Sequence, residues 1–366
     1  MYMKNVEHEH EAHEGKRNGV YGHDMIAIGA SAGGVEALMR LVRDLPRSIH
    51  AALFIVLHIP ADSPSLLPEL LSRSGALPAS HAVDGQEIQH GHIYVASPDH
   101  HLLVEKGRMR VVQGPKENRH RPAIDPLFRS LALAYGSRAI GVVLTGALDD
   151  GTAGLLAIKR RNGLAIVQDP ADALYPSMPE SALAHVNVDY KVPLVEIAPL
   201  LTRLSKEVSQ HMEKNALPED MEIEVRMAEA DLGVQREDKQ VGNPSAYSCP
   251  ECGGVLWEIQ EGELVRYRCR VGHAFSMDSM LAGQSEALED AIWVAFKIVQ
   301  EQAAMARRVA EQMEAKGRTY LARRYEERQR DSEQRASLLL KALKRLDPVT
   351  PEDLAETNTV DTSESV

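Results

Sequence analysis

Long apolar runs and signal-like segments are missing from this 366-residue chain. No stretch approaches the roughly 20 apolar residues that a membrane-spanning helix requires, so no membrane insertion is expected. The opening residues, MYMKNVEHEHEAHEGKRNGVYGHD, include no apolar segment and therefore do not have the pattern of a signal peptide. These absences predict a cytoplasmic protein.

Acidic residues outnumber basic ones, and cysteine is scarce. The formal net charge is −12, and a field of that sign opposes binding to phosphates, so no nucleic-acid partner is expected. There are only three cysteines, Cys249, Cys252 and Cys269, and all of them lie in one short window. An odd number of clustered cysteines is a poor basis for disulfides and favours metal ligation.

The apolar content of 44% and the charged content of 26% are ordinary for a globular protein, and the length favours two or three domains. Changes in composition then divide the chain into segments. We expect a disordered tail at 1–23, an α/β domain at 24–204, a linker with transient helix at 205–246, a compact cysteine-containing unit at 247–276, a helical hairpin at 277–347 and a disordered tail at 348–366.

The segment 24–204 alternates short apolar runs with amphipathic stretches. The continuous apolar runs predict buried strands, and they are MIAIGA (25–30), AALFIVLHI (51–59), HIYVAS (92–97), AIGVVLTG (139–146) and GLAIVQD (163–169). Helical segments between several of them indicate a mainly parallel sheet that is covered on both faces. HLLVEKGRMRVVQG (101–114) has instead the pattern of a hairpin. The sequence therefore predicts a doubly wound, three-layer α/β fold with an antiparallel addition.

Ser31 stands where the first predicted strand meets a glycine turn and a helix, in IAIGASAGG (26–34). At the carboxyl end of a strand, its hydroxyl would face the edge where open α/β folds place their sites, and the following helix would favour a developing oxyanion. The segment fits the G-x-S-x-G pattern of a nucleophile elbow but not the glycine spacing of a dinucleotide site. Alternatively, Ser31 only caps the helix, a role that stabilises it by about 1 kcal/mol.

Two further strand ends supply polar residues to the same edge. His58 closes the second apolar run, and the fourth run leads into a glycine turn that contains Asp149 and Asp150. Because neighbouring parallel strands bring their carboxyl ends together, a serine, a histidine and an aspartate can meet there as nucleophile, base and orienting group. The plainer alternatives are a polar residue at a strand end for His58 and turn capping for the aspartates.

In these segments the chain resembles the catalytic domain of the chemotaxis protein-glutamate methylesterases, the CheB type. The resemblance runs in order through nearly all of 24–204, in IGASAGG (28–34), LHIPADSPSLLPELL (57–71), GHIYVASPDHHL (91–102), NRHRPAIDPLFRSLA (118–132), VVLTGALDDGTAGL (142–155) and QDPADALYPSMPESA (168–182). It implies Ser31 as the nucleophile, His58 as the base and Asp150, rather than Asp149, as the orienting carboxylate.

The same resemblance implies a reaction, a partner and a cofactor requirement. The reaction is hydrolysis of glutamyl methyl esters on chemoreceptors through acyl transfer, with deamidation of glutamine as a second activity. Backbone N–H groups of Ala32 and Ala147 are the candidates for the oxyanion hole. The partner is a methylated chemoreceptor or receptor-like protein, and no cofactor is expected for catalysis.

Two features depart from the family. Ala32 stands where a hydroxyl residue commonly follows the nucleophile, and only 24 residues precede the first strand, too few for the phosphorylatable receiver domain that usually comes first. These departures leave two alternatives open. The chain could be a low-activity signalling scaffold with the same fold, or an esterase that acts on a target outside chemotaxis.

The cysteine-containing unit has the layout of a zinc ribbon. Cys249 and Cys252 form a C-x2-C knuckle followed by two glycines, Cys269 and His273 form a second pair, and the stretch between the pairs alternates like a hairpin around Glu261-Gly262. Four protein ligands of this kind predict a structural zinc ion. A redox C-x-x-C is the alternative, although no βαβ pattern surrounds it.

Beyond this unit, residues 281–346 carry apolar residues at helical spacings that are interrupted at Lys316-Gly317. The pattern predicts two long antiparallel helices. Their apolar stripe could bind a separate receiver or signalling protein, or the two helices could simply pack on each other.

Overall fold

A computed structural model of the chain describes residues 22–207, 209, 218–231 and 241–345. The predicted tail at 348–366, the predicted tail at 1–23 except for residues 22 and 23, and parts of the predicted linker therefore lie outside the described residues. We use "α/β domain" for residues 22–207 and "C-terminal unit" for residues 218–231 and 241–345.

A seven-stranded parallel sheet forms the centre of the α/β domain, as the apolar runs predict. The strand order changes direction at β1, because the chain adds strands first on the β2 side and later on the β7 side. Across the sheet the order is β3 (Ala79–His81), β4 (Ile93–Val95), β2 (Ala52–Leu57), β1 (Met25–Ala30), β7 (Ala139–Val143), β8 (Leu164–Gln168) and β9 (Tyr190–Val192). The switch point between β1 and β7 is where such sheets open a crevice.

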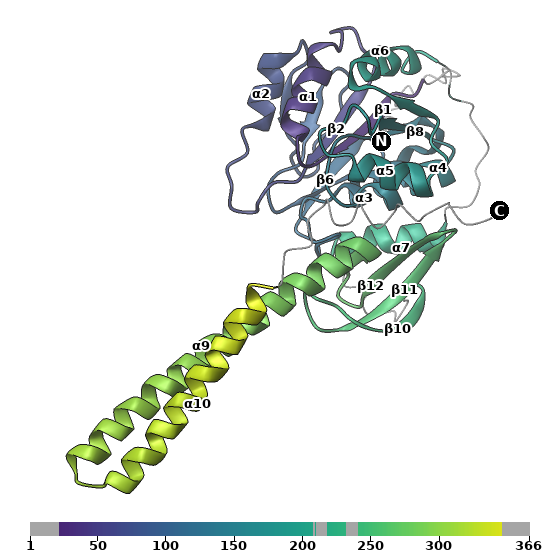
Figure 1. Cartoon of the computed structure of the whole chain (residues 1–366). Coiled ribbons are helices and arrows are strands. Elements are labelled where there is room, and N and C mark those ends of the chain that lie inside the picture. The colour runs from purple at the N-terminus through teal and green to yellow at the C-terminus, as the bar shows by residue number, and fades with distance from the viewer. Residues whose placement is uncertain (1–21, 208, 210–217, 232–240, 346–366) are drawn as a thin grey trace, which may run out of the picture.

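Helices cover both faces of the sheet, which completes the predicted three-layer fold (Figure 1). One apolar core joins the sheet to α1 (Gly34–Arg43), α2 (Leu67–Ser74) and α6 (Leu194–Leu204). A second core joins the opposite face to α3 (Ile124–Tyr135), α4 (Thr152–Arg160) and α5 (Ser177–His185), and a 3₁₀ turn (Gly136–Arg138) follows α3.

The predicted hairpin is present as a separate two-stranded antiparallel sheet, β5 (His101–Glu105) and β6 (Arg108–Val112). Gly107 occupies its turn at φ 80, a left-handed conformation that glycine adopts readily. Leu102, Val104 and Met109 are buried in the same core as α3, so the hairpin adds to that layer. No described helix combines the length and the apolarity that crossing a lipid bilayer would need.

The segment expected as a linker contains a well-packed helix, α7 (Glu219–Ala228). Met221 and Met227 are buried, and Glu224, between them on the same side, is also buried. A buried glutamate at this position breaks the apolar pattern on which the sequence prediction depended, and its arginine partners lie far away in the sequence. The first strand of the next sheet also begins inside this segment.

The C-terminal unit consists of α7, a four-stranded antiparallel sheet and a helical arm (Figure 1). The strands are β10 (Asn243–Ser248), β11 (Val255–Glu261), β12 (Leu264–Cys269) and β13 (Ala274–Ser276). The β11–β12 turn at Gly262 confirms the predicted hairpin. The arm is the predicted helix pair, α9 (Met277–Ala315) and α10 (Thr319–Leu343), which pack on each other through small buried residues such as Ala306 and Ala336.

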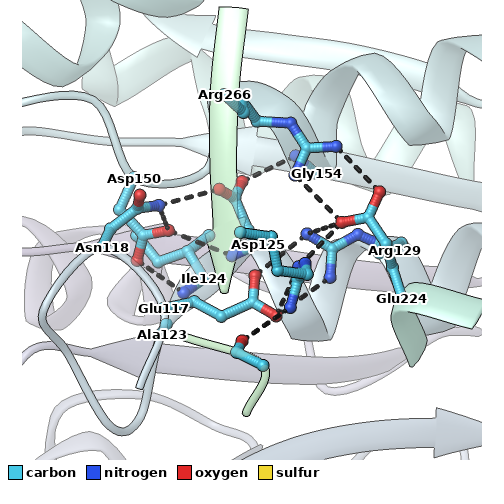
Figure 2. A network of polar contacts seen from close by, with 12 residues as sticks. Glu117, Asn118, Ala123, Ile124, Asp125, Arg129, Asp150, Gly154, Glu224 and Arg266 are labelled. Atoms are coloured by element: carbon cyan, nitrogen blue, oxygen red, sulfur yellow. Dashed lines mark hydrogen bonds and ion pairs between the residues drawn. The ribbon is translucent and has the colours of Figure 1, made fainter. Parts of the chain in front are cut away.

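Buried ion pairs join the C-terminal unit to the α3 side of the α/β domain (Figure 2). Arg268 of β12 donates to Glu117 at 3.0 Å and to Glu224 at 2.7 Å, and Arg129 of α3 donates to Glu117 at 3.0 Å. The members of this charged cluster are Glu117, Arg129, Glu224, Glu261, Arg266 and Arg268. Because most of these groups are shielded from water, the contact depends on their mutual pairing.

Candidate active site

Three neighbouring strand ends bring Ser31, His58 and Asp150 together. Ser31 directly follows β1, His58 directly follows β2, and Asp150 ends the loop after β7. Since β1 pairs with both other strands, their carboxyl ends converge at the switch point. The Oγ of Ser31 lies 3.1 Å from Nδ1 of His58, and Nε2 of His58 lies 2.7 Å from Oδ2 of Asp150.

The contacts of the imidazole assign its proton. An ionised Asp150 only accepts hydrogen bonds, so Nε2 of His58 donates to it, and the lone pair of Nδ1 is left facing Ser31. The ring is used in the opposite sense to the serine protease triad, in which Nδ1 faces the aspartate. The side chains of His58 and Asp150 are only 5% and 2% exposed, so water competes little for their hydrogen bond.

Asp150 accepts hydrogen bonds from four groups. Besides His58, these are the N–H groups of Ile124 at 2.7 Å and Asp125 at 3.2 Å, at the start of α3, and Nδ2 of Asn118 at 2.9 Å. Burial by itself raises the pKa of Asp150, but the hydrogen bond and charge of His58, together with the other donors, hold it below its usual range. Asp150 is therefore ionised at neutral pH.

Asn118 ties Asp150 to a second buried carboxyl group, that of Asp125 (Figure 2). The Nδ2 of Asn118 lies 2.9 Å from an oxygen of each aspartate. The other oxygen of Asp125 accepts from the N–H groups of Gly151 and Gly154 at the start of α4. Burial, followed by the charge of Asp150, raises the pKa of Asp125. The negative charge of the pair is thus concentrated on Asp150, beside His58.

Backbone N–H groups are available near the Ser31 hydroxyl. The N–H of Ser31 itself donates to Thr145 at 3.0 Å, whereas among the described residues those of Ala32 and Ala147 donate to no protein acceptor. Gly146 lies against Ser31, because a Cβ added at 146 would lie 2.9 Å from the Cβ of Ser31. The two N–H groups predicted for the oxyanion hole thus have no protein acceptor among the described residues, and they follow Ser31 and Gly146 directly in the chain.

His120 was not found by sequence reasoning, although its ring stacks on that of His58 with 3.7 Å between centroids. Burial, with a further contribution from His58, lowers the pKa of His120 to about 3. His120 is therefore neutral at ordinary pH, and it fixes the plane of His58 without adding charge. It lies in a loop without periodic pattern, so no sequence signal marked it.

Asp149 points to a different partner from Asp150. Its Oδ1 accepts a hydrogen bond of 2.7 Å from the hydroxyl of Ser276 in the C-terminal unit, and it is buried. Burial raises the pKa of Asp149 to about 7. The geometry thus gives the two adjacent aspartates separate surroundings, with Asp150 at His58 and Asp149 at the contact with the C-terminal unit.

The four predicted zinc ligands converge in the C-terminal unit, with their ligand atoms within 4.8 Å of one another. The Sγ atoms of Cys252 and Cys269 are 3.8 Å apart, and Nδ1 of His273 lies 3.5 Å from Cys269 and 3.7 Å from Cys249. A tetrahedral ion with Zn–S of about 2.3 Å and Zn–N of about 2.0–2.1 Å separates two sulfurs by about 3.8 Å and sulfur from nitrogen by about 3.6 Å. The residues therefore fit a zinc ion.

A second group of metal-ligating types, Asp24, His50 and His90, fits an ion poorly. Both oxygens of Asp24 are already engaged by the guanidinium of Arg138, at 2.8 and 2.7 Å. A cation there would have to compete with a fixed positive charge, so we assign this group a structural role.

A hydrogen-bonded serine, histidine and aspartate at the carboxyl edge of a parallel sheet is an arrangement typical of α/β serine hydrolases. The family model described as CheB methylesterase matches residues 26–201. A putative protein-glutamate methylesterase/protein-glutamine glutaminase of Leptospira interrogans is 40% identical over 185 residues, which are 50% of this chain and 96% of that protein. The chain belongs to the CheB methylesterase family.

Two further relatives have the same extent of match. Protein-glutamate methylesterase/protein-glutamine glutaminase 2 of Xanthomonas oryzae is 38% identical over 50% of this chain and 51% of its own length. The crystal structure of the Thermotoga maritima CheB methylesterase catalytic domain is 31% identical over 50% of this chain and 98% of that chain, with a TM-score of 0.48. The family match ends at residue 201, so the C-terminal unit lies beyond it.

Proposed function

We propose that this chain hydrolyses glutamyl methyl esters on a chemoreceptor or receptor-like protein and deamidates glutamine at the same site. The observation that supports this most is the hydrogen-bonded series from Ser31 through His58 to Asp150. The names of the relatives, which pair the two activities, give the substrate class. Such receptors are modified on their cytoplasmic helices, so the proposal places the chain in the cytoplasm.

The reaction would begin with attack of the Ser31 oxygen on the ester carbonyl carbon while its proton moves to Nδ1 of His58. The N–H groups of Ala32 and Ala147 would donate to the resulting oxyanion. Collapse of the intermediate expels methoxide, which takes the proton from His58 and leaves as methanol. Water then attacks the acyl group, gives one proton to His58, and releases glutamate as that proton returns to Ser31. For glutamine, ammonia leaves in place of methanol.

Asp150 would hold His58 in the tautomer that accepts the serine proton and would stabilise the imidazolium that forms. Ala32 contributes only its N–H group, so the site lacks any hydroxyl donor at that position. Loss of one oxyanion donor typically slows such reactions by about 10²–10³-fold. Measurable turnover by the wild type would thus argue against the scaffold alternative.

Methanol release from a methylated receptor cytoplasmic fragment tests the proposal. We expect Ser31→Ala to abolish release without unfolding the protein. Ser80 offers a matched control, because its hydroxyl also contacts a histidine, His92, at 2.9 Å. Among the described residues, no carboxylate pairs with that histidine as Asp150 pairs with His58. Ser80→Ala should keep wild-type release. A folded wild-type chain that binds the fragment and releases no methanol would contradict the proposed activity and support the scaffold.

We also propose that Cys249, Cys252, Cys269 and His273 hold one structural zinc ion. The ligand spacing and the match to tetrahedral distances support it. Elemental analysis of the purified chain should give one zinc per chain, reduced by Cys252→Ser and retained by Asp24→Asn in the other cluster. Equal zinc in wild type and Cys252→Ser would contradict the assignment.

The exposed apolar side chains of the arm, such as Trp293, Ile298 and Met305, are proposed to contact a separate receiver or signalling protein. A pull-down with arm variants that replace these side chains by glutamate would test this. Unchanged capture of a defined receiver protein by the variants would rule the surface out.

A further inference from the structure

A short loop separates the triad from the C-terminal unit. We call residues 116–121 the relay loop. Strand β13 lies along it, because the N–H of Asn118 donates to the carbonyl of Ala274 at 2.8 Å and the N–H of Ala274 donates to that of Lys116 at 3.3 Å. Further along the loop, Arg119 pairs with Glu286 of α9. The C-terminal unit therefore contacts the relay loop through both backbone and side chains.

The inner side of the relay loop contacts two members of the triad. The amide nitrogen of Asn118 donates to Asp150, and the ring of His120 stacks on His58. The left-handed backbone at Asn118, with φ 49, is a conformation that asparagine tolerates better than most residues. The loop is thus shaped to present this amide to the carboxylate.

The outer side of the same amide is held by the first turn of α9. The Oδ1 of Asn118 accepts from the N–H of Ser276 at 3.0 Å and from the hydroxyl of Ser279 at 3.1 Å. Ser276 caps α9 by accepting from the N–H of Ser279, and its hydroxyl donates to Asp149. These side chains are all buried.

These contacts determine which way the amide faces. An amide has one accepting and one donating end, and only the donating end can face the carboxylate of Asp150 without repulsion. Two donors from α9 require the accepting end to face outward, which turns the NH₂ group toward Asp150 and Asp125. Without these donors, the amide could rotate and expose Asp150 to its oxygen.

We propose that Ser276 and Ser279, which lie beyond the family domain, are positioning residues for the triad and act on Asp150 through Asn118. The inference rests on the proposed roles of Ser31, His58 and Asp150. It makes the C-terminal unit a working component of the esterase rather than an attachment to it.

The experiment is a double-mutant cycle in the full chain with Ser279→Ala, Asn118→Gly and the combined variant. Glycine removes the amide while accepting the left-handed backbone. The readout is the rate at which a fluorophosphonate ester modifies Ser31, located by mass spectrometry, because this reagent needs an activated serine but no receptor. Ser332→Ala, a buried serine in the arm, is the matched control. Should Asn118→Gly fail to fold, the isosteric Asn118→Asp takes its place.

We expect the rate to fall about 10–100-fold in Asn118→Gly and about 3–10-fold in Ser279→Ala, as for other supporting hydrogen bonds. If Ser279 acts through Asn118, the combined variant should match Asn118→Gly alone. Multiplied losses, or a wild-type rate in either single variant, would overturn the proposal. The control should keep the wild-type rate.

The pH profile gives a readout that a merely structural role would not change. Without the Asn118 donor, the negative charge of Asp150 is stabilised less, so Asp150 keeps a proton up to a higher pH. The acidic limb of the rate profile should move upward in Asn118→Gly and in the same direction in Ser279→Ala. Unshifted limbs would count against positioning.

The outcomes separate this inference from the proposed function. If the reagent modifies Ser31 but the receptor fragment releases no methanol, the proposed substrate is wrong. The double-mutant cycle still tests whether Ser279 acts through Asn118. A wild-type chain in which the reagent leaves Ser31 unmodified would overturn both.

Discussion

The interior of the central sheet and the contact between the α/β domain and the C-terminal unit are both buried, but the first consists of apolar side chains and the second contains charged ones. The sheet interior is apolar on both faces, with strands such as β1 and β2 buried along their whole length. The contact instead contains the charged cluster around Glu117, Glu224 and Arg268.

The difference matters because the two kinds of contact specify structure differently. Apolar burial is non-directional and tolerates changes of shape that conserve volume. Buried ion pairs are favourable only in one arrangement, since any unpaired member is costly. The apolar sheet therefore supplies stability, while the charged contact fixes the position of β13 and α9 beside the relay loop.

The largest expected effect concerns the proposed zinc ion. Chelation should unfold the four-stranded sheet, because structural zinc contributes on the order of 10 kcal/mol to the folding of such units. None of the four proposed zinc ligands lies in the central sheet, so that sheet should remain folded. Hydrogen exchange checks this, with protection expected to disappear from β11 and β12 and to persist in β1 and β2. Equal loss in both sheets would break the comparison.

Removal of one buried charge comes next. Arg268→Met leaves Glu117 and Glu224 short of a partner and should cost about 3–5 kcal/mol in the stability of the C-terminal unit. Both tryptophans, Trp257 and Trp293, lie in that unit, so tryptophan fluorescence during urea unfolding reports on it alone. Arg324→Met at an exposed position of α10 serves as the control. A change below 1 kcal/mol in Arg268→Met would show that the cluster is dispensable.

A smaller effect should follow pH through Asp149, whose pKa of about 7 lies above the usual aspartate range. The folded state holds this proton while the unfolded state has lost it, so the free energy of unfolding falls by about 1.4 kcal/mol for each pH unit between about 4 and 7. Asp149→Asn can still accept from Ser276 but does not titrate. The same fluorescence transition should depend less on pH in the variant, and parallel profiles would contradict the assignment.

The smallest effect belongs to the sheet interior. Ile55→Val in the fully buried β2 removes one methylene group and should cost about 0.5–1.5 kcal/mol. The loss should appear in far-ultraviolet circular dichroism of the α/β domain, with the tryptophan transition unchanged. A loss as large as that of Arg268→Met would mean that the sheet is no more tolerant than the contact.

The same contrast explains what the sequence predicted. Continuous apolar runs mark buried strands directly, and the polar residues at their ends mark Ser31, His58 and the pair Asp149 and Asp150 as candidates. The choice of Asp150 over Asp149 came from the resemblance to the family. The cysteine spacing likewise marks its cluster. These signals are local, so one chain without relatives is enough to read them.

Asn118, His120 and Glu224 could not be found in this way. In the sequence they are polar residues in segments without apolar period, which is also the pattern of a solvated loop or helix face. Their roles come from partners that are distant in the sequence, such as Ser276 for Asn118, His58 for His120 and Arg266 for Glu224. Only the folded chain brings those partners together.

The charged cluster also bears on how the two parts can exist apart. Glu117 and Arg129 belong to the α/β domain, and they already pair with each other. Glu224 and Glu261 of the C-terminal unit pair with its own Arg266, while Arg268 bridges the contact. Each part is therefore electroneutral within the cluster, so that docking transfers no net charge out of water. A substitution that changes the charge of one part alone would therefore leave a net charge buried in the contact.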